Sequence, residues 1–499
     1  MIIVLFIVIY ATIGSYCNIL VKITIFRLFF ISLVQQNMKN EIFMAFRTAI
    51  VLFSDDFRVK DNPALHYAVK NYENIIPLYI YNETYLGRVI GAGAKAFLHN
   101  VLLSFNSLLH AEYCISLIIK NGNYVDEIKK ILSIEKIDAI YFNKSYTLSQ
   151  IQIENDIKEC FKDLDIQFFK AKLLFEPSEI KPLSGGAFYR VFTPFSKECL
   201  KNIELIEQSF PKPEQIKSIH NISSMTVENL NLLPAKEGKW AQNLLQHWTF
   251  DYDEIECNFI KFIDNKLENY EENRNIPSKN GNSGISPYLR FGILSPKMCF
   301  NAVRSKNIDI NHQFILELLW REFAYHVMFY NQNIATQELK NEYKNFQWDD
   351  SKFFLQKWQK SQTGFDIIDA GMNELWHTGV MHNRVRMIVA SFLIKDLLIN
   401  WKIGEQWFWN TLVDADPAIN PFSWQWIFGS GFDAAPYFRI FNPESQKKKF
   451  DPDGSYCKKW LPKNWKSEKI VSHDIQRKIT LERYKNLRCR LVQCIDNKS

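Results

Sequence analysis

Short apolar runs alternate with longer amphipathic stretches in the first half of the chain. The apolar runs are TAIVLF (48–53), NIIPLYIY (74–81), CISLIIK, IDAIYFN (137–143) and IQFFKA, and stretches with helical periodicity lie between them. Continuous apolar strands separated by helices of about 10 to 15 residues are typical of a parallel sheet that is covered on both faces. The pattern therefore predicts an α/β domain with a doubly wound parallel sheet over residues 44–175.

Helical periodicity dominates the second half. Helices are predicted over HQFILELLWREFAYHVMFY (312–330), GVMHNRVRMIVASFLIKDLLINW (379–401) and the stretches GFDIIDAGMNELW and EQWFWNTL. All 13 tryptophans lie between Trp240 and Trp465, and a bias of this size indicates a separate domain. We therefore predict a mostly helical domain over 251–470. A proline-containing linker at 176–250 would precede it, and a short tail at 471–499 would follow it.

Composition and charge narrow the class of protein only a little. Hydrophobic residues make up 47% of the 499 residues and charged residues 23%, which excludes disorder for most of the chain. The formal net charge of +6 permits binding to a polyanion but does not require it. Nine cysteines without a CxxC or Cys/His cluster predict neither a zinc site nor disulfides, and favour reduced thiols in a cytoplasmic protein.

The first 43 residues (1–43) differ from the rest. They are strongly apolar, but Gly14, Asn18, Lys22 and Arg27 interrupt the run, and no small-residue cleavage site marks a signal peptide. A membrane anchor and a leader that is not part of the folded protein both fit this pattern. We favour the leader, because MAFRTAIVLF already opens the first predicted strand.

The helix predicted over residues 379–401 combines an apolar body with charged first turns. From Met387 to Ile394 the pattern is apolar on every face, which is typical of a buried helix. A buried arginine such as Arg386 stays protonated, so it needs anionic or carbonyl partners. Asp414 and Asp416 in LVDADPAIN could bind a metal or perform acid/base chemistry, or they could be those partners. No His or Cys accompanies them at metal-ligand spacing, which favours the second interpretation.

Four side chains of the helix predicted over 312–330 share one face. Phe314, Glu317, Trp320 and Arg321 recur at spacings of three and four residues. They could form an aromatic core contact beside a Glu317–Arg321 ion pair. They could equally line a cavity, with a flat ring for stacking and a carboxylate for hydrogen bonding.

A loop of small residues precedes this helix. GNSGISPYLRFG places Asn282, Ser283 and Ser286 around two glycines, and such groups suit a phosphate or pyrophosphate. Tyr270 and Arg274, one turn apart on the preceding helix, could bind the same anion. The dinucleotide fingerprint GxGxxG is absent, so the first domain shows no cofactor site by that test.

Several long motifs occur together in this chain. SGISPYLRFG, ELLWREF, TGFDIIDAGM, TGVMHNRVRMIVASFLIKDLLINW, LVDADPAIN, SWQW and DAAPYFRIFNP closely resemble the photolyase/cryptochrome flavoproteins, most closely the class I cyclobutane pyrimidine dimer photolyases. The resemblance runs from Phe46 to about residue 470. It implies a noncovalent, U-shaped FAD in the helical domain and an antenna pigment near the α/β domain.

The resemblance assigns cofactor contacts motif by motif. Arg386 and Asp414 would form an ion pair beside the flavin ring, which gives an anionic reduced flavin a fixed positive field. Asn420 would face the reactive ring nitrogen, while Asp416 and Asn383 would bond the flavin and its adenine side. The other implied cofactor-binding residues are Tyr270, Arg274, Asn282, Ser283, Ile285, Ser286, Phe314 and Arg321, with Asn282 in place of the usual Thr.

The resemblance also implies a substrate and a reaction. Ultraviolet-damaged DNA would bind with its pyrimidine dimer flipped out of the duplex, which costs less than extruding a normal base. Light would excite the reduced flavin, one electron would pass to the dimer, the cyclobutane ring would open and the electron would return. The protein would thus be a carbon–carbon lyase that needs no metal and makes no net redox change.

Roles in repair follow from the same motifs. Glu317 would bond the thymine edge, Asn383 would reach a carbonyl, and Met387 would pack beside the cyclobutane ring. The stacking residues would be Trp320 and Trp426, and the phosphate-binding residues Arg384 and Arg439. A chain that reduces oxidised flavin from the surface would consist of Trp424, Trp401 and Trp348.

Departures from the family pattern leave part of the function open. Phe314 stands where Trp is usual, and Leu52 and Ser54 replace the usual Trp and Arg of the antenna domain. The antenna could therefore be a folate, a deazaflavin, another flavin or absent. Alternatives to the repair enzyme are a cryptochrome-type photoreceptor that signals to a protein partner and an unrelated adenine-nucleotide-binding protein. We expect a monomer without an obligate protein partner and, unless the leader is retained, without membrane attachment.

Overall fold

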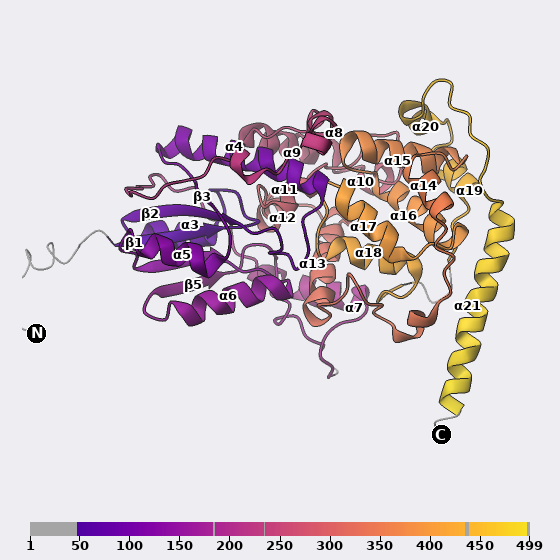
Figure 1. Cartoon of the computed structure of the whole chain (residues 1–499), viewed down its shortest axis with the longest axis horizontal. Helices are drawn as coiled ribbons and strands as arrows, with labels where there is room; N and C mark the ends of the chain where they lie inside the picture. Colours follow the sequence, from indigo (N-terminus) through magenta and orange to yellow (C-terminus); the bar gives the residue numbers. More distant parts are fainter. Residues whose placement is uncertain (1–46, 183–184, 234, 435–438, 497–499) are drawn as a thin grey trace, which may run out of the picture.

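The computed structural model describes residues 47–182, 185–233, 235–434 and 439–496. The apolar leader at 1–43 and part of the motif DAAPYFRIFNP lie outside these ranges, so the predictions made for them are not addressed. Figure 1 shows an α/β half at one end of the molecule and a helical half at the other. Within the described ranges, no helix is long and apolar enough to cross a membrane.

The α/β half is built on a five-stranded parallel sheet with the order β3-β2-β1-β4-β5. Its strands are β1 (Thr48–Phe53), β2 (Asn74–Tyr81), β3 (Ile118–Asn121), β4 (Ala139–Asn143) and β5 (Asp165–Phe169). The connecting helices are α3 (Pro63–Asn71), α4 (Ala92–Tyr113), α5 (Tyr124–Leu132) and α6 (Leu148–Cys160). Every residue of β1, β2 and β4 is buried, because helices cover both faces of the sheet. The predicted doubly wound sheet is confirmed.

The segment predicted as a linker, 176–250, is folded against both halves. It contains α7 (Phe192–Lys201), the 3₁₀ turns η1 (Ile203–Leu205) and η2 (Glu228–Leu230), and α8 (Ala235–Leu245). Its extended part follows the sheet, where Ile75 N donates to Lys217 O at 2.8 Å and Met225 N donates to Ile119 O at 3.0 Å. Side chains of α7 pack on the helical half, so the segment contributes to the core of both.

The helical half confirms the predicted change of architecture. Its elements are α9 (Tyr252–Lys266), α10 (Tyr270–Asn273), α11 (Ser286–Arg290), α12 (Pro296–Arg304), α13 (Gln313–Tyr330), η3 (Asn341–Asn345), α14 (Lys352–Gln359), α15 (Asp366–Thr378), α16 (Asn383–Ser391), η4 (Phe392–Asp396), α17 (Trp401–Thr411), α18 (Ile419–Phe428), α19 (Pro443–Phe450) and α20 (Ser455–Trp460). The predicted buried helix is α16. It passes directly into η4, a π-helical turn, and both are buried from Ile388 onward.

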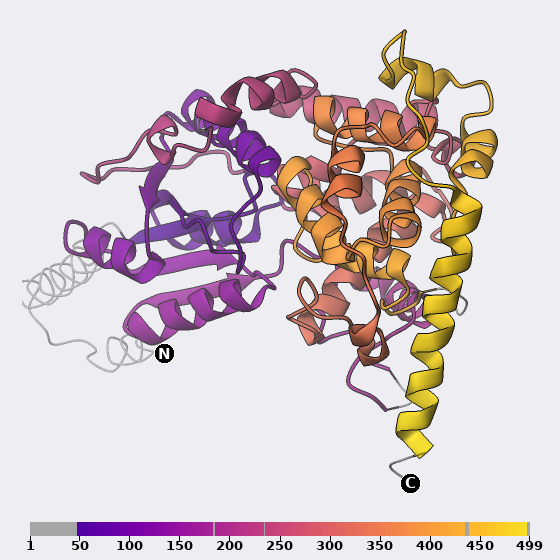
Figure 2. The same cartoon turned by 45° about the vertical axis from the view of Figure 1, so that its right-hand side comes forward.

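The C-terminal segment, predicted as a short tail, is the long helix α21 (His473–Asp496). Figure 2 shows α21 lying along the outer edge of the helical half. It is attached to η4, where His473 Nδ1 lies 2.5 Å from Asp396 Oδ1 and Thr480 Oγ1 donates to Lys395 O at 2.5 Å. The segment is therefore part of the folded structure.

Lys395 makes this junction sensitive to pH. Burial, followed by the positive charge of Arg439, lowers the pKa of Lys395 to about 7. Between pH 7 and 10.5 the native state then binds fewer protons than the unfolded state, so stability rises with pH across this window. We expect urea denaturation of the wild type to show a gain of about 2 kcal/mol from pH 7 to pH 9 that Lys395→Met lacks. Lys448→Met, at an exposed position, is the control, and an equal gain in wild type and Lys395→Met would contradict the prediction.

Candidate functional site

The central feature of the helical half is an ion pair between α16 and the loop before α18. Arg386 Nη2 lies 2.8 Å from Asp414 Oδ2 and 3.1 Å from Asp414 Oδ1. Arg386 Nε also donates to Met381 O at 2.7 Å, and Ser286 Oγ donates to Asp414 Oδ2 at 2.7 Å. The predicted contact between Arg386 and Asp414 is confirmed, and it brings the loop before α11 to the same place.

Asp416 bonds a different set of groups from Asp414. Its Oδ2 accepts from the Tyr325 hydroxyl at 2.7 Å, and its Oδ1 accepts from Ala418 N at 2.9 Å and Ile419 N at 3.0 Å. The interpretation of Asp416 as a partner of Arg386 is therefore wrong. Its carboxylate instead bonds two backbone amides at the start of α18, where helix N–H groups lack acceptors.

A second polar group lies where α10 meets α13. The Tyr270 hydroxyl and the Arg274 guanidinium both contact the Glu317 carboxylate. Burial raises the pKa of Glu317, while Arg274 and the hydrogen bond from Tyr270 act in the opposite direction. Of the two interpretations left open for this face, the one with a Glu317–Arg321 ion pair is wrong, because Arg321 Nη1 donates to Lys172 O at 2.8 Å and lies 3.3 Å from Glu322 Oε1. Side-chain spacing on one helix could not reveal these partners from other segments.

Two aromatic residues of α13 are packed by neighbouring elements. The Trp320 ring stacks on Phe192 of α7, with the centroids 3.8 Å apart and the planes 10° apart. A ligand could therefore stack only on the other face of Trp320. Phe314 is buried and contacts Phe262 and Tyr270, at centroid distances of 5.6 and 5.7 Å. The Phe314 ring thus packs against the Tyr270 ring.

The predicted phosphate-binding loop lies beside α10. A Cβ added at Gly281 would lie 2.7 Å from the Asn273 carbonyl carbon, so the loop touches the end of that helix. Gly284 has a φ of +70°, which favours glycine, and a Cβ there would meet no atom within 4 Å. Open space with flanking Asn282 and Ser283 side chains fits an extended anionic ligand. Ile285 is buried beneath the loop.

Positively charged side chains lie close together at the start of α16. Arg384 Nη2 donates to Asn275 Oδ1 at 2.5 Å, and its guanidinium lies 4.5 Å from the centre of the Phe450 ring. Burial and then the charges of Arg274 and Arg439 lower the pKa of Arg384. Among the described residues, Arg384 Nε has no hydrogen-bond partner although it is buried. This cluster fits a phosphate-bearing ligand.

Asn383 and Met387 lie on the same stretch of α16. Asn383 is exposed at the first helical position, and Met387 Sδ lies 3.8 Å from Arg384 Nη1. His382, directly before them, accepts from Arg384 N through Nδ1 at 3.2 Å. Burial and the neighbouring Arg384, Arg274 and Arg386 lower the pKa of His382 to about 4, so the ring is neutral at pH 7.

The three tryptophans of the predicted electron chain lie on segments that contact one another in space. A Cβ at Gly404, one turn beyond Trp401 on α17, would overlap the Trp424 ring. Next to Trp348, Asp349 N donates to Leu398 O at 2.9 Å, close to where α17 begins. Electron transfer along them stays a prediction. Trp426 Nε1 donates to Asp433 O at 3.1 Å, which fixes the orientation of that ring.

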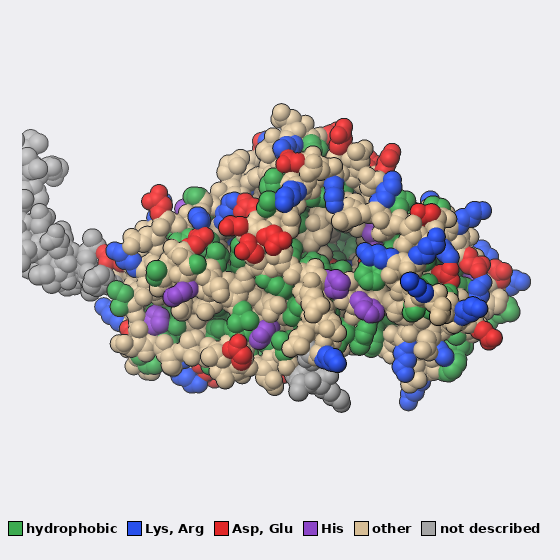
Figure 3. Space-filling model, turned by 90° about the horizontal axis from the view of Figure 1, so that it is seen from above, with side chains coloured by type: hydrophobic (Ala, Val, Ile, Leu, Met, Phe, Trp, Pro, Cys, Tyr) green, Lys and Arg blue, Asp and Glu red, His purple; other side chains and the backbone are tan. Residues whose placement is uncertain are grey.

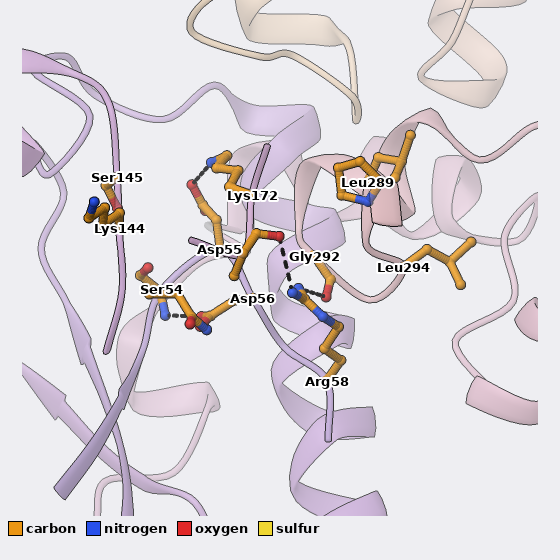
Figure 4. A pocket seen from close by; sticks show the side chains of 13 residues that line it. Ser54, Asp55, Asp56, Arg58, Lys144, Ser145, Lys172, Leu289, Gly292 and Leu294 are labelled. Atoms are coloured by element: carbon orange, nitrogen blue, oxygen red, sulfur yellow. Dashed lines mark hydrogen bonds and ion pairs between the residues drawn. The ribbon is translucent and has the colours of Figure 1, made fainter. Parts of the chain in front are cut away.

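A pocket lies between the two halves, at the carboxyl ends of β1, β4 and β5 (Figure 4). Its lining includes Ser54, Asp55, Asp56, Arg58, Asn143, Lys172, Leu289 and Gly292. Asp55 lies 2.7 Å from Lys172 Nζ and 2.8 Å from Arg290 Nη1. Burial alone would raise the pKa of Asp55, but Arg290 and Lys172 outweigh it and hold that pKa below its usual range. The strand order reverses between β1 and β4, which is where open α/β sheets bind ligands.

The fold and the site define a two-domain flavoprotein of the photolyase/cryptochrome class. A family model described as DNA photolyase matches residues 49–214, and one described as the FAD binding domain of DNA photolyase matches residues 314–493. The chain belongs to the DNA photolyase family, and its helical half is an FAD-binding domain. The FAD-binding match includes most of α21, beyond the predicted end of the domain at residue 470.

Relatives and solved structures agree with this assignment. The chain is 37% identical to a deoxyribodipyrimidine photo-lyase of Agrobacterium fabrum over 86% of this chain and 90% of the relative. It is 30% identical to cryptochrome-2 of Arabidopsis thaliana over 83% and 70%, respectively. A class III photolyase structure from Agrobacterium tumefaciens is 34% identical, with a TM-score of 0.83 over 89% of this chain and 98% of that one. An archaeal photolyase from Sulfolobus tokodaii with two FAD molecules is 28% identical, with a TM-score of 0.71 over 88% and 100%.

Removal of the Asp414 carboxylate should weaken FAD binding. Asp414→Ala would leave Arg386 without its counter-charge and Ser286 without its acceptor, so the loop before α11 would lose a tie to α16. We expect the affinity for FAD to fall about tenfold, which corresponds to about 1.4 kcal/mol, and the flavin-to-protein absorbance ratio after purification to fall with it. Asp349→Ala removes an exposed ion pair to Arg483 and should keep the wild-type ratio. Full flavin content in Asp414→Ala would refute this account of the site.

Proposed function

We propose that this protein repairs cyclobutane pyrimidine dimers in DNA with light and a bound, reduced FAD. Arg274, Arg384 and Arg386 lie around His382. This observation carries the proposal, because Arg386 belongs to the polar group centred on Asp414 and Arg274 belongs to the polar group centred on Glu317. One group, centred on Asp414, suits a flavin. The other, centred on Glu317, suits the edge of a base.

The residues of the flavin group would fix the cofactor and its charge. Arg386 would hold a positive charge beside the ring, and Asp414 would keep that guanidinium in place through two short contacts. Asn282, Ser283 and Ser286 would bind the phosphates and ribityl chain in the open space beside Gly284. When bound and reduced, the flavin would supply the electron on absorbing light.

The residues of the second group would hold the flipped-out dimer. Glu317, kept in place by Tyr270 and Arg274, would bond the pyrimidine edge, and the free face of Trp320 would stack on it. Arg384 would contact a phosphate next to the lesion, and Arg439, whose charge acts on Arg384, would contact another. Figure 3 shows lysine and arginine side chains gathered beside a hollow on one face, which suits a polyanion.

A cryptochrome-type photoreceptor is the second candidate, because cryptochrome-2 of Arabidopsis is a relative at 30% identity. Such a receptor has no need for a carboxylate that bonds a pyrimidine edge, so the role proposed for Glu317 separates the two candidates. The similar Agrobacterium structure is a class III photolyase, and the predicted class I subclass stays a prediction. So do a monomeric state and the absence of an obligate protein partner.

A second chromophore, where one is bound, would lie near the pocket between the two halves, which itself has room for little more than a water molecule. The pocket lies at the sheet edge where α/β proteins bind ligands, and the Sulfolobus structure is associated with a light-harvesting cofactor. Its charged lining, with Asp55, Asp56, Arg58 and Lys172, suits a polar chromophore such as a folate or a flavin. Mass analysis of the extracted chromophores would identify it.

Glu317→Ala tests the proposed repair. Loss of the hydrogen bond to the dimer should lower the yield of repair about three- to tenfold while the flavin content is unchanged. The measurement is loss of dimers from an ultraviolet-irradiated oligonucleotide under blue light with the reduced protein. Glu272→Ala, at an exposed position on α10, is the control. Repair by Glu317→Ala at the wild-type yield would exclude the assigned role, and no repair by the wild type would favour the photoreceptor.

A further inference from the structure

A short segment of the α/β half is docked against α17 of the helical half. A Cβ at Gly91 would overlap the Trp409 carbonyl oxygen, and a Cβ at Gly93 would lie 2.6 Å from the Thr411 carbonyl oxygen. Two hydrogen bonds cross the same junction, from Trp409 Nε1 to Val89 O at 2.8 Å and from Ala92 N to Asn410 Oδ1 at 3.2 Å. Gly91 and Gly93 of GRVIGAGAK thus permit close approach of two backbones at the start of α4.

Arg88 extends from this segment to a buried carboxylate. Its Nη1 and Nη2 donate to Glu405 Oε2 and Oε1 at 2.9 and 2.8 Å, and its guanidinium lies 3.4 Å from the centre of the Trp409 ring. The Glu405 side chain is only 2% exposed and that of Arg88 is 21% exposed. Two parallel hydrogen bonds and a ring contact fix both the position and the orientation of the guanidinium. Arg88 also supplies the positive charge that a buried carboxylate requires.

Glu405 in turn orients the side-chain amide of Asn420. Asn420 Nδ2 donates to Glu405 Oε1 at 2.8 Å and to Glu405 O at 3.2 Å. Neither an ionised carboxylate nor a carbonyl can donate, so the nitrogen of the amide must face Glu405. The oxygen of Asn420 is then the atom available to a neighbour on the other side, and Asn420 is itself buried.

We propose that Arg88 is a positioning residue for the flavin: through Glu405 it fixes the Asn420 amide with its oxygen toward the reactive ring nitrogen. This inference rests on the proposed function, in which Asn420 faces that nitrogen. An oxygen there accepts a hydrogen bond from the protonated ring nitrogen and favours that form. The α/β domain would thus influence the flavin's affinity for a proton, whether or not it holds a chromophore of its own.

Loss of the Arg88 charge should allow the side-chain amide of Asn420 to rotate. A carboxylate that is buried without a counter-charge takes up a proton, because the neutral form is less costly to bury. A protonated Glu405 can donate, so only the longer bond to Glu405 O still holds the amide nitrogen, and Asn420 can turn its oxygen toward the Glu405 side chain and its NH₂ group toward the flavin. Two donors would then face each other at the ring nitrogen, which disfavours its protonation.

The test compares five variants of the full-length, FAD-loaded protein with the wild type. The readouts are the absorption spectrum of the bound flavin after one-electron photoreduction and its midpoint potential as a function of pH. In Arg88→Met we expect the ratio of ring-protonated to unprotonated flavin to fall about tenfold, the effect of roughly one hydrogen bond. Arg88→Lys keeps the charge without the paired contact and should give an intermediate ratio. Lys95→Met removes an ion pair to Glu83 in the same domain and should behave as the wild type.

Glu405→Gln covers the case in which Arg88→Met folds poorly or loses FAD. Glutamine keeps the shape of Glu405 and can donate to Asn420, so it should give the same fall in the ratio. A wild-type ratio in Glu405→Gln, or in a well-folded Arg88→Met, would overturn the inference. Asn420→Ala separates this failure from failure of the proposed site. If Asn420→Ala changes the flavin spectrum while the Arg88 and Glu405 variants do not, only the positioning role is wrong, and if it changes nothing, the assignment of Asn420 is wrong as well.

Discussion

The ion pair between Arg386 and Asp414 determines how the helical half is arranged around its site. A partly buried guanidinium needs a fixed anion, so the chain from Leu412 to Asn420 has to return to the start of α16. The same loop is held at two further points, where Arg290 Nε donates to Ala415 O at 2.9 Å and the Tyr325 hydroxyl donates to Asp416. Three elements therefore hold one short loop, which carries Asp414 and leads directly into α18, where Asn420 is the second residue.

The two halves are joined by charges as well as by apolar contacts. Arg290 Nε donates to Ala415 O, while Arg290 Nη1 forms an ion pair with Asp55 of the α/β half, which also pairs with Lys172. Buried charges are stable only when each has a partner, so this network tolerates little relative movement of the halves. The geometry of the flavin site thus depends on the α/β half at the Arg290 and Arg88 junctions. This dependence gives the α/β half a structural role in the arrangement of the helical half.

Features set by local pattern could be predicted from the sequence, and features set by distant partners could not. Apolar runs predicted β1, β2 and β4, and the charge of Arg386 in an apolar helix predicted its contact with Asp414. In contrast, Glu317 pairs with Arg274, directly after α10, instead of Arg321, its neighbour one turn away. The contact of Phe192 with Trp320 joins residues far apart in the chain, and no local signal marks it. The motifs identified the family, but they could not show which partner each charged side chain has.

The tryptophans show why residue type alone is weak support for a role in electron transfer. Trp358, Trp401 and Trp409 are all fully buried, and only Trp401 belongs to the predicted chain. Packing is therefore a sufficient reason for a buried tryptophan in this half. The Trp409 ring also contacts the Arg88 guanidinium. The predicted chain runs from the buried Trp424 and Trp401 to Trp348, which is half-buried and packs 4.9 Å from Phe428. A route that takes electrons from solvent needs such an outer end, and a set of tryptophans that only fill the core does not.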